Sequence, residues 1–334
     1  MSTQPMPTPD LFFETAFAFQ RTAALKSAVQ LDLFTAIGDG GTTADVAAQR
    51  CGASLRGTRI LCDYLTVLGF LTKSDGVYRL TPASSTFLTK QSPAYLGGTL
   101  DFLTIPQLTH SFDDLTGTIR RGHVAPPNNM VSSENPVWVE FARAMVPMMM
   151  PAAQAIADLL GASTGPLRVL DIAAGHGMFG ITVAQRNPQC EVVAVDWPQV
   201  LTVALESARA GGVADRYRTL PGDAFTVEFG TGYDIALVTN FLHHFDPPAC
   251  TAFLRKIASA LKPGGRVVVL EFVPNPDRVS PPFPAMFSLT MLAETPGGDA
   301  YTLDELRRFL EEAGFTNVTA HPLPTPETVV IARR

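Results

Sequence analysis

The chain has 334 residues, which is long enough for two or three domains. Hydrophobic residues make up 46% of it and charged residues 17%, so the composition excludes an intrinsically disordered chain and predicts a globular one. The net charge of −6 argues against a nucleic acid as the main ligand.

The four cysteines are far apart in the sequence and form no C-x-x-C pair: Cys51, Cys62, Cys190 and Cys250. This pattern predicts buried thiols in a reducing compartment. The first ten residues lack the basic start and apolar run of a signal peptide. The longest apolar stretch, residues 141–162, contains Arg143, Asp158 and two prolines, which a bilayer-spanning helix would not tolerate. We therefore expect a cytoplasmic protein that does not enter the membrane.

The first hundred residues show helical patterns followed by a hairpin signal. Apolar residues at helical spacing predict a helix over residues 11–37, and residues 42–45 resemble a capping box that opens a second helix ending at Gly52. Ser54 is placed to cap a third helix that runs to Leu68. Asp75-Gly76 between two β-rich runs is typical of a two-residue hairpin turn. This order predicts a mostly helical winged-helix domain over residues 1–100.

A winged helix often binds DNA, but the expected recognition helix is mostly apolar. Its basic residues Arg56 and Arg59 are a weak electrostatic footprint for a phosphate backbone. A packing or dimerisation module fits better, because the first helix carries four phenylalanines: Phe12, Phe13, Phe17 and Phe19. We expect a homodimer with no nucleic-acid partner, and a ligand-responsive DNA-binding regulator is the alternative.

The sequence of residues 101–160 predicts a helical connector that prolines interrupt. Methionines are concentrated in its last third, and their flexible side chains adapt to flat apolar ligands. We expect Phe141, Met145 and Met149 to line a pocket for such a ligand. Met286 and Thr290, which follow a Pro-Pro break, are expected to roof the same pocket. Plain hydrophobic core is the alternative for all five residues.

The pattern of apolar residues changes after residue 160. Apolar runs over residues 168–172, 191–195, 234–239 and 266–271 alternate with helical stretches. This alternation predicts an α/β fold, a Rossmann-like doubly wound parallel sheet with helices on both faces. A helix over residues 302–313 and strands over 315–320 and 327–332 predict a C-terminal antiparallel hairpin.

The turn after the first of these strands is rich in glycine. Gly175, Gly177 and Gly180 formally satisfy the dinucleotide fingerprint G-x-G-x-x-G, and an acid, Asp196, ends the second strand. A nicotinamide oxidoreductase is therefore one alternative. Asp171, immediately before the turn, opposes it, because its carboxylate would repel a pyrophosphate. A cationic nucleoside without phosphates, such as S-adenosylmethionine, suits that acid better.

Five ordered segments resemble the motifs of class I S-adenosylmethionine-dependent small-molecule O-methyltransferases of the plant caffeate and hydroxyindole type and their bacterial relatives. They are residues 171–177 (family D-x-G-x-G-x-G), 195–200 (F-D-L-P-x-V), 222–225 (G-D-M-F), 240–250 (L-H-D-W-S-D-x-x-C) and 261–266. Together with the winged-helix start, the resemblance covers nearly the whole chain. It implies an S-adenosylmethionine-binding domain over residues 161–334 and a homodimer that methylates a hydroxyl group of a small, flat, aromatic acceptor.

The resemblance also implies a role for each matching residue. Asp171, Gly175 and Gly177 would hold the methionine portion of the donor, Asp196 its ribose and Asp223 its adenine. The remaining residues expected around the donor are Trp197, Ala224, Phe225 and Asn240. His243 would be the general base, and Glu271 would orient its ring and stabilise the imidazolium form.

Three positions depart from the family pattern. Ala173 replaces the first glycine of the loop, a change that fits a negative φ. Ala300 stands where the family has a second glutamate beside the histidine, and Asp299 is the neighbouring acid that would serve in its place. Thr239 replaces a lysine. These changes weaken the expectation for the acceptor chemistry, so methylation of a carbon or nitrogen atom on an aromatic ring stays an alternative.

Two further expectations concern His244 and metals. Adjacent residues point in different directions, so we expect His243 to face the site and His244 to face solvent. No cluster of carboxylate or amide residues suggests a metal-held catechol site, so we expect metal-independent chemistry.

Overall fold

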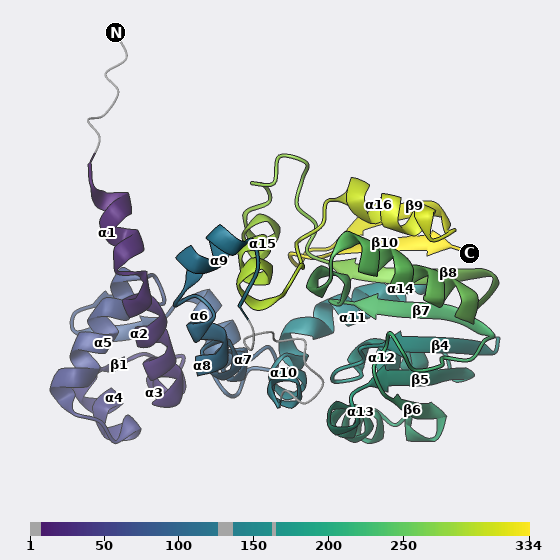
Figure 1. Cartoon of the computed structure of the whole chain (residues 1–334). Coiled ribbons are helices and arrows are strands. Elements are labelled where there is room, and N and C mark those ends of the chain that lie inside the picture. Colours follow the sequence, from purple (N-terminus) through teal and green to yellow (C-terminus); the bar gives the residue numbers. More distant parts are fainter. Residues whose placement is uncertain (1–7, 126–135, 162–164) are drawn as a thin grey trace, which may run out of the picture. The chain divides into compact units, whose positions relative to one another are not determined.

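The computed structural model describes residues 8–125, 136–161 and 165–334. The chain forms two compact units, one that ends at Thr104 and one that begins at Ile105. Figure 1 labels most of their helices and strands.

The first unit is a bundle of short helices with a small antiparallel sheet. Its elements are α1 (Asp10–Ala16), α2 (Ala18–Gln30), α3 (Leu33–Ile37), β1 (Thr42–Thr43), α4 (Ala44–Cys51), α5 (Leu55–Val67), β2 (Leu71–Ser74), β3 (Val77–Leu80), α6 (Pro82–Leu88) and α7 (Gly97–Leu103). The strands lie in the order β1-β3-β2, and Phe34, Leu65 and Tyr78 are at the centre of the core.

Two expectations for this unit are confirmed and two are wrong. The Ser54 hydroxyl accepts a hydrogen bond from the Gly57 N–H, and Asp75 and Gly76 both have the positive φ of a tight hairpin turn. The single helix over residues 11–37 is instead three helices, and Asp32, with φ 52°, separates α2 from α3. Residues 42–45 form no capping box, because Thr42 and Thr43 pair with β3 and the Thr43 side chain makes no cap bond.

The second unit contains the α/β sheet. Its helices are α8 (Pro106–His110), α9 (Leu115–Arg121), α10 (Val137–Ala144), α11 (Val146–Leu160), α12 (Met178–Arg186), α13 (Pro198–Ala210), α14 (Pro247–Ala260), α15 (Pro282–Glu294) and α16 (Leu303–Glu312), with short 3-10 helices η1 (Ala214–Arg216) and η2 (Leu242–His244). Its strands are β4 (Leu167–Ile172), β5 (Cys190–Asp196), β6 (Tyr217–Pro221), β7 (Tyr233–Thr239), β8 (Leu261–Glu271), β9 (Thr316–Pro322) and β10 (Thr328–Arg333).

The seven strands lie in the order β6-β5-β4-β7-β8-β10-β9. The first five are parallel, and β10 pairs antiparallel with both β8 and β9, so the doubly wound sheet and its C-terminal hairpin are confirmed. The strand order reverses between β4 and β7, and the carboxyl ends of these strands are where open α/β sheets bind ligands. The edge strand β6 was not among the strands expected from apolar runs, because its sequence YRTLP is no apolar run.

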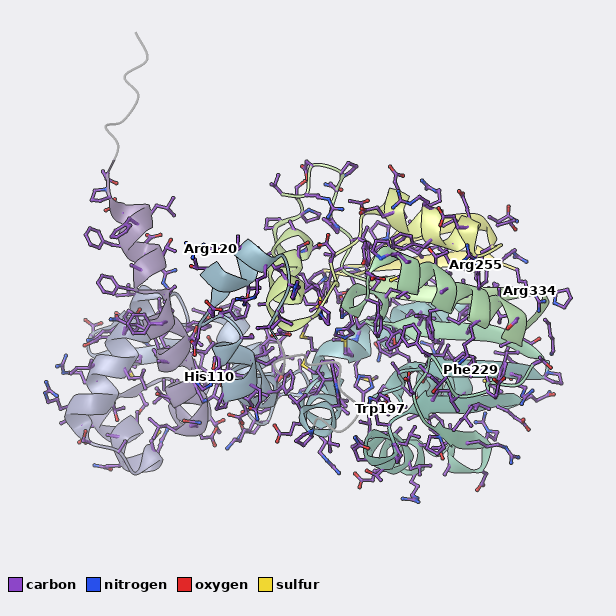
Figure 2. All side chains as sticks on the ribbon, viewed as in Figure 1. His110, Arg120, Trp197, Phe229, Arg255 and Arg334 are labelled. Carbon is purple, nitrogen blue, oxygen red and sulfur yellow. The ribbon has the colours of Figure 1, made fainter. Side chains whose placement is uncertain are left out.

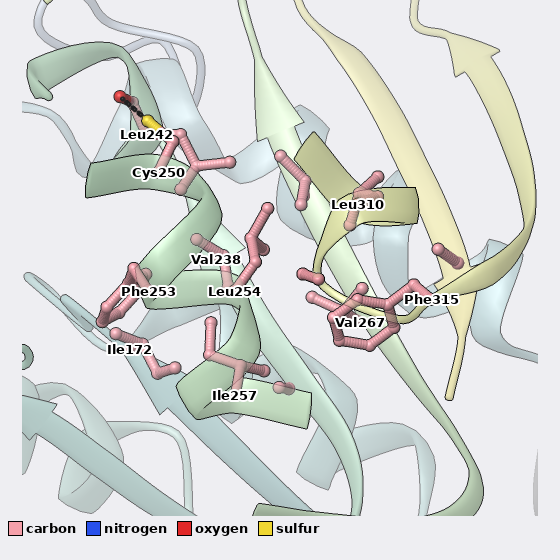
Figure 3. Packing of buried hydrophobic residues seen from close by; sticks show 14 of the residues in the cluster. Ile172, Val238, Leu242, Cys250, Phe253, Leu254, Ile257, Val267, Leu310 and Phe315 are labelled. Atoms are coloured by element: carbon pink, nitrogen blue, oxygen red, sulfur yellow. Dashed lines mark hydrogen bonds between the residues drawn. The ribbon is translucent and has the colours of Figure 1, made fainter. Parts of the chain in front are cut away.

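The main hydrophobic core lies between the sheet and helices α14 and α16. Figure 3 shows Val238 and Val267 of the sheet packed with Phe253, Leu254 and Ile257 of α14. The same view shows the Cys250 thiol donating to the Leu242 carbonyl oxygen at 3.2 Å, which ties the start of α14 to η2. Helix α16 begins with a true capping box, in which Thr302 and Glu305 bond each other's backbone N–H groups. This side of the sheet is therefore a fixed support for the loops at its carboxyl edge.

In the part of the chain that the structure describes, no helix combines the length and the apolar character that crossing a membrane requires.

Truncating a side chain in this core tests its contribution. Leu254 is fully buried, so Leu254→Ala is expected to lower the free energy of unfolding by about 2–5 kcal/mol through lost transfer energy and the cavity left behind. Urea unfolding followed by circular dichroism measures the change. Val67→Ala, at a side chain that is 81% exposed, is the control and should change stability by less than about 0.5 kcal/mol. A Leu254→Ala change of similar size to the control would contradict the described core.

Candidate active site

The glycine-rich turn connects β4 to α12. Gly175 and Gly177 have φ values of 57° and 76°, the left-handed region that glycine adopts without steric cost. Ala173 has φ 52°, so the expected negative φ is wrong at this position. A left-handed alanine is strained by about 1–2 kcal/mol, and the rest of the turn holds it in place.

Asp171 lies under this turn and is fully buried. Its Oδ2 accepts the Gly180 N–H at 3.0 Å, and a Cβ added at Gly180 would lie 2.6 Å from that oxygen. The third glycine of the G-x-G-x-x-G pattern therefore lets α12 approach the carboxyl group. Burial raises the pKa of Asp171 to about 8, and its Oδ1 has no hydrogen-bond partner among the described residues.

The next two acids lie at the ends of the neighbouring strands, since Asp196 is the last residue of β5 and Asp223 follows β6. Asp196 accepts the Gly175 N–H at Oδ2 (2.8 Å) and the Trp197 N–H at Oδ1 (2.7 Å). Desolvation outweighs these two bonds and raises the pKa of Asp196 to about 6. Asp223 accepts the Phe225 N–H at 2.8 Å. Because β4, β5 and β6 are parallel neighbours, all three acids lie at the carboxyl ends of these strands, on one side of the sheet's strand ends.

The apolar residues expected near this edge have well-defined surroundings. Trp197 is the N-cap residue of α13, is half-buried and is labelled in Figure 2. Ala224 is buried, and its carbonyl oxygen accepts the Lys256 ammonium at 2.9 Å. The Phe225 ring packs against Phe245 and Phe253 with ring centroids 4.7 Å from each. Phe225 thus belongs to an aromatic cluster that supports the loop after β6.

Asn240 follows β7, the strand beside β4. It has φ 51°, its N–H donates to the Leu270 carbonyl oxygen at 2.8 Å, and its Nδ2 donates to the Met149 sulfur at 3.4 Å. Its Oδ1 is buried, and the structure describes no partner for it. Val238 pairs with Ile172, so Asn240 lies beside the start of the glycine turn.

His243 lies three residues after Asn240 and contacts Glu271, the last residue of β8. His243 is 4% exposed, Glu271 is 1% exposed, and the imidazole Nδ1 lies 2.5 Å from Glu271 Oε2. Glu271 Oε1 accepts the N–H groups of Phe241 and Leu242 at 3.1 and 2.8 Å. A carboxylate already bound to these donors accepts the Nδ1 proton, so the neutral ring carries its lone pair on Nε2. This pair can take a proton from a bound group and stabilise the resulting imidazolium.

His244 lies against the other side of His243. Its ring is 4.3 Å from the His243 ring and 5.6 Å from Trp138, both measured between centroids. The expectation that His244 faces solvent is wrong, because the ring is half-buried and its Nδ1 lies in the interior. Burial, with a smaller effect of His243, holds its pKa well below the usual range, so His244 is neutral.

Asp299 contacts His243 through its backbone. Its N–H donates to the His243 carbonyl oxygen at 3.0 Å, while its carboxylate accepts Arg278 at 3.1 Å and its neighbour Ala300 at 2.8 Å. A Cβ added at Gly298 would lie only 2.1 Å from the His243 carbonyl oxygen. The segment 298–300 therefore supports the backbone of His243, and the Asp299 side chain turns toward Arg278.

The expected pocket residues differ in burial. Met145 and Met149 are buried, Phe141 and Thr290 are half-buried, and Met286 is 64% exposed. An aromatic group next to them was not predicted from the sequence: Phe287 packs edge-on against His243 at 4.9 Å, and Phe272 packs against Phe287 at 4.5 Å. Trp138, 5.8 Å from Phe141, was also missed. The four-residue spacing of Phe283 and Phe287 on α15 was the available signal.

The described residues contain no group of three histidine, cysteine, aspartate or glutamate side chains placed to hold a metal ion.

Comparisons with known proteins agree on the family. The profile of the O-methyltransferase domain matches residues 141–316, which is more than half of the chain. The profile of the O-methyltransferase dimerisation domain matches residues 13–90.

Individual relatives align over nearly full length. The chain is 28% identical to 3-hydroxy-5-methyl-1-naphthoate 3-O-methyltransferase of Streptomyces sahachiroi, covering 95% of this chain and 92% of that protein. It is 28% identical to L-tyrosine C(3)-methyltransferase of Streptomyces lavendulae, covering 97% and 91%. A crystal structure described as an O-methyltransferase from Nostoc punctiforme is 50% identical, has a TM-score of 0.95 and covers 99% of this chain and 100% of that one.

The fold, the site and these matches lead to one assignment. The chain belongs to the S-adenosylmethionine-dependent O-methyltransferase family that carries an N-terminal dimerisation domain.

Proposed function

We propose that this enzyme transfers the methyl group of S-adenosyl-L-methionine to a hydroxyl of a small aromatic molecule, with His243 as the general base. The observation that carries the proposal is the buried contact between His243 Nδ1 and Glu271 Oε2, which leaves the Nε2 lone pair to receive a proton. The naphthoate and tyrosine methyltransferases among the relatives act on aromatic molecules, which supports this substrate class.

The residues at the sheet edge fit the donor. Gly175 and Gly177 expose backbone to a ligand, and the unpartnered Oδ1 atoms of Asp171 and Asn240 can accept hydrogen bonds or face positive charge. Asp196 uses one lone pair of each oxygen internally and keeps others for the ribose hydroxyls. We assign the adenine to Asp223 with Ala224, Phe225 and Trp197 around it. When bound, S-adenosylmethionine supplies an electrophilic methyl group with a good leaving group.

The chain's residues do the remaining work. A phenol has a pKa near 10, so roughly one molecule in a thousand is ionised at neutral pH. His243 Nε2 accepts the phenol proton as the oxygen–carbon bond forms and the sulfur–carbon bond breaks, and Glu271 stabilises the imidazolium. Asp299 acts through its backbone bond to the His243 carbonyl oxygen and through the Arg278 ion pair that fixes its segment.

We assign the acceptor pocket to Phe141, Met145, Met149 and Thr290, with Phe287 against the base. Met286, being mostly exposed, is placed at the rim. These apolar walls position a flat ring and exclude water, which in-line methyl transfer requires. Residues 101–160, where the structure describes them, contribute helices α10 and α11 to this pocket.

We also propose a cytoplasmic homodimer assembled through residues 1–100. Within this unit, helices α1 and α2 expose large apolar side chains: Leu11, Phe12, Phe13, Phe17 and Phe19. Exposed apolar patches of this kind mark protein–protein contacts, and the match to a dimerisation domain agrees.

Carbon methylation is the second candidate, because L-tyrosine C(3)-methyltransferase is as similar as the naphthoate O-methyltransferase. A hydroxyl that loses its proton to His243 also activates the ring carbon beside it. Mass spectrometry of a product made with labelled donor separates a methyl ether from a ring-methylated phenol. The family assignment favours methyl transfer over the nicotinamide oxidoreductase and the DNA-binding regulator that the sequence left open.

Removing the base tests the proposal directly. His243→Ala is expected to lower kcat by about 10²–10⁴-fold, because the proton loses its acceptor in the transition state. Titration calorimetry should find the Kd for S-adenosylhomocysteine within two-fold of wild type. His110→Ala, at an exposed histidine, is the control and should leave both quantities unchanged. Wild-type turnover in His243→Ala would remove the base role.

The pKa of Asp196 gives a pH prediction for donor binding. The charged carboxylate is the form that accepts ribose hydroxyls at both oxygens, and in the free protein it is lost as pH falls through about 6. We expect affinity for S-adenosylhomocysteine to fall as the pH is lowered from 7 to 5. Asp196→Asn should bind more weakly at pH 7 and show a smaller fall in affinity, and the part that remains is assigned to Asp171, whose pKa is about 8. An unchanged pH profile in the variant would contradict the ribose assignment.

Gly298 lies so close to the His243 carbonyl oxygen that one added methyl group is expected to lower the activity of the enzyme. Gly298→Ala would place Cβ against the His243 carbonyl oxygen, a backbone atom that must then move. We expect kcat to fall at least ten-fold, because misplacing a catalytic group by about 1 Å costs about 10²-fold. Gly165→Ala is the matched control, since a Cβ there meets open space. Equal activity of the two variants would contradict this role of segment 298–300.

A further inference from the structure

Two unpartnered polar atoms lie beneath the glycine turn. One is Asp171 Oδ1, and the other is the hydroxyl of Tyr217, the first residue of β6. Tyr217 is 4% exposed, and the described residues offer its hydroxyl no hydrogen-bond partner. Leaving a buried phenol hydroxyl unpaired costs about as much as breaking a hydrogen bond, so such a group needs an explanation.

The Tyr217 hydroxyl lies directly against the glycine turn, at Gly177. A Cβ added at Gly177 would be 2.6 Å from the Tyr217 oxygen, and its next neighbours would be Ala204 and Ile181 of α13 and α12. The glycine at position 177 thus does more than permit a positive φ, because it also gives the tyrosine room under the turn.

Asp171 lies on the same face of the sheet. A Cβ added at Gly180 of α12 would meet both Asp171 Oδ2 and Val192 Cγ1, and Val192 is the β5 residue paired with Tyr217. Burial raises the pKa of Tyr217 well above its usual range, and the charges of Asp171 and Asp196 raise it further. The hydroxyl is therefore a protonated donor within reach of the electrostatic field of both carboxyl groups.

We propose that Tyr217 is a positioning residue of the donor site, whose hydroxyl donates through one buried water molecule to Asp171 Oδ1 and so fixes the glycine turn. A buried water with two or more polar partners is the usual way in which such atoms are satisfied. Burial raises the pKa of Asp171 to about 8, and a hydrogen bond to its carboxylate lowers this pKa and so favours the charged form, which attracts a cationic ligand. This inference rests on the proposed function for the identity of the donor, and Tyr217 itself touches no reacting atom.

Removing only the hydroxyl gives the test. Tyr217→Phe is expected to raise the Kd for S-adenosylhomocysteine and the KM for the donor about three- to ten-fold, the size typical of one lost hydrogen bond. At saturating donor, kcat should stay within two-fold of wild type. A merely structural tyrosine would change thermal stability without this split between KM and kcat.

Tyr233→Phe is the matched control. Tyr233 is also a buried tyrosine of the same sheet, but its hydroxyl donates to the Phe229 carbonyl oxygen at 2.8 Å, away from the donor loop. This variant should lower the melting temperature and leave the Kd for S-adenosylhomocysteine unchanged.

A double-mutant cycle links the tyrosine to the acid. In an Asp171→Asn background, Tyr217→Phe should change the Kd by less than two-fold, because the charged acceptor is already gone. Should Asp171→Asn fail to fold, a crystal structure of the wild-type protein serves instead, and a water bonded to both Tyr217 Oη and Asp171 Oδ1 is expected.

The outcomes of these experiments distinguish the role of Tyr217 from the proposed function of the enzyme. Equal Kd values for wild type and Tyr217→Phe, additive effects in the cycle, or a high-resolution structure without the bridging water would overturn the role of Tyr217 alone. A wild-type protein that binds no S-adenosylhomocysteine would overturn the proposed function and this inference with it.

Discussion

The site is organised by a buried imidazole, His243, that a buried carboxylate, Glu271, holds in place. Taking a carboxylate out of water is costly unless donors replace its hydration, and Glu271 has such donors in the Phe241, Leu242 and His243 N–H groups. These same N–H groups belong to the turn that carries His243. One carboxylate therefore shapes the turn and also selects the tautomer of the ring.

The rest of the second unit fixes the position of His243 and Glu271 relative to the glycine turn between β4 and α12. β7 and β8 are adjacent parallel strands, so the residues after β7 and the last residue of β8 meet at one edge. Cys250 and the core around α14 fix η2 from one side, and the Asp299 N–H fixes the His243 carbonyl from another. Asn240 connects the two halves of the site, because it follows the same strand as His243 and lies beside the glycine turn.

Much of this could be predicted from the sequence where a signal was local. The parallel strands were predicted from their apolar runs, Asp171 and Asp196 from the ends of those strands, and His243 from the resemblance to a family motif. β6 escaped notice because an edge strand needs no continuous apolar run, and Tyr217 was missed with it.

Features that depend on distant partners were not predictable in the same way. The φ of Ala173 follows from the packing of the whole turn, and the position of His244 follows from Trp138 on α10. The Asp299 carboxylate was expected near His243, but its direction is set by Arg278, twenty-one residues earlier in the chain. No short-range pattern reports such contacts.

The central claim is that Glu271 holds a proton on His243 Nδ1, so that Nε2 faces the acceptor as a base. Nitrogen-15 spectra of the protein labelled at histidine, recorded with S-adenosylhomocysteine bound, distinguish the two tautomers and the charged ring. The contact with Glu271 predicts that the neutral ring of His243 carries its proton on Nδ1 and none on Nε2. A neutral ring with its proton on Nε2 would contradict this assignment.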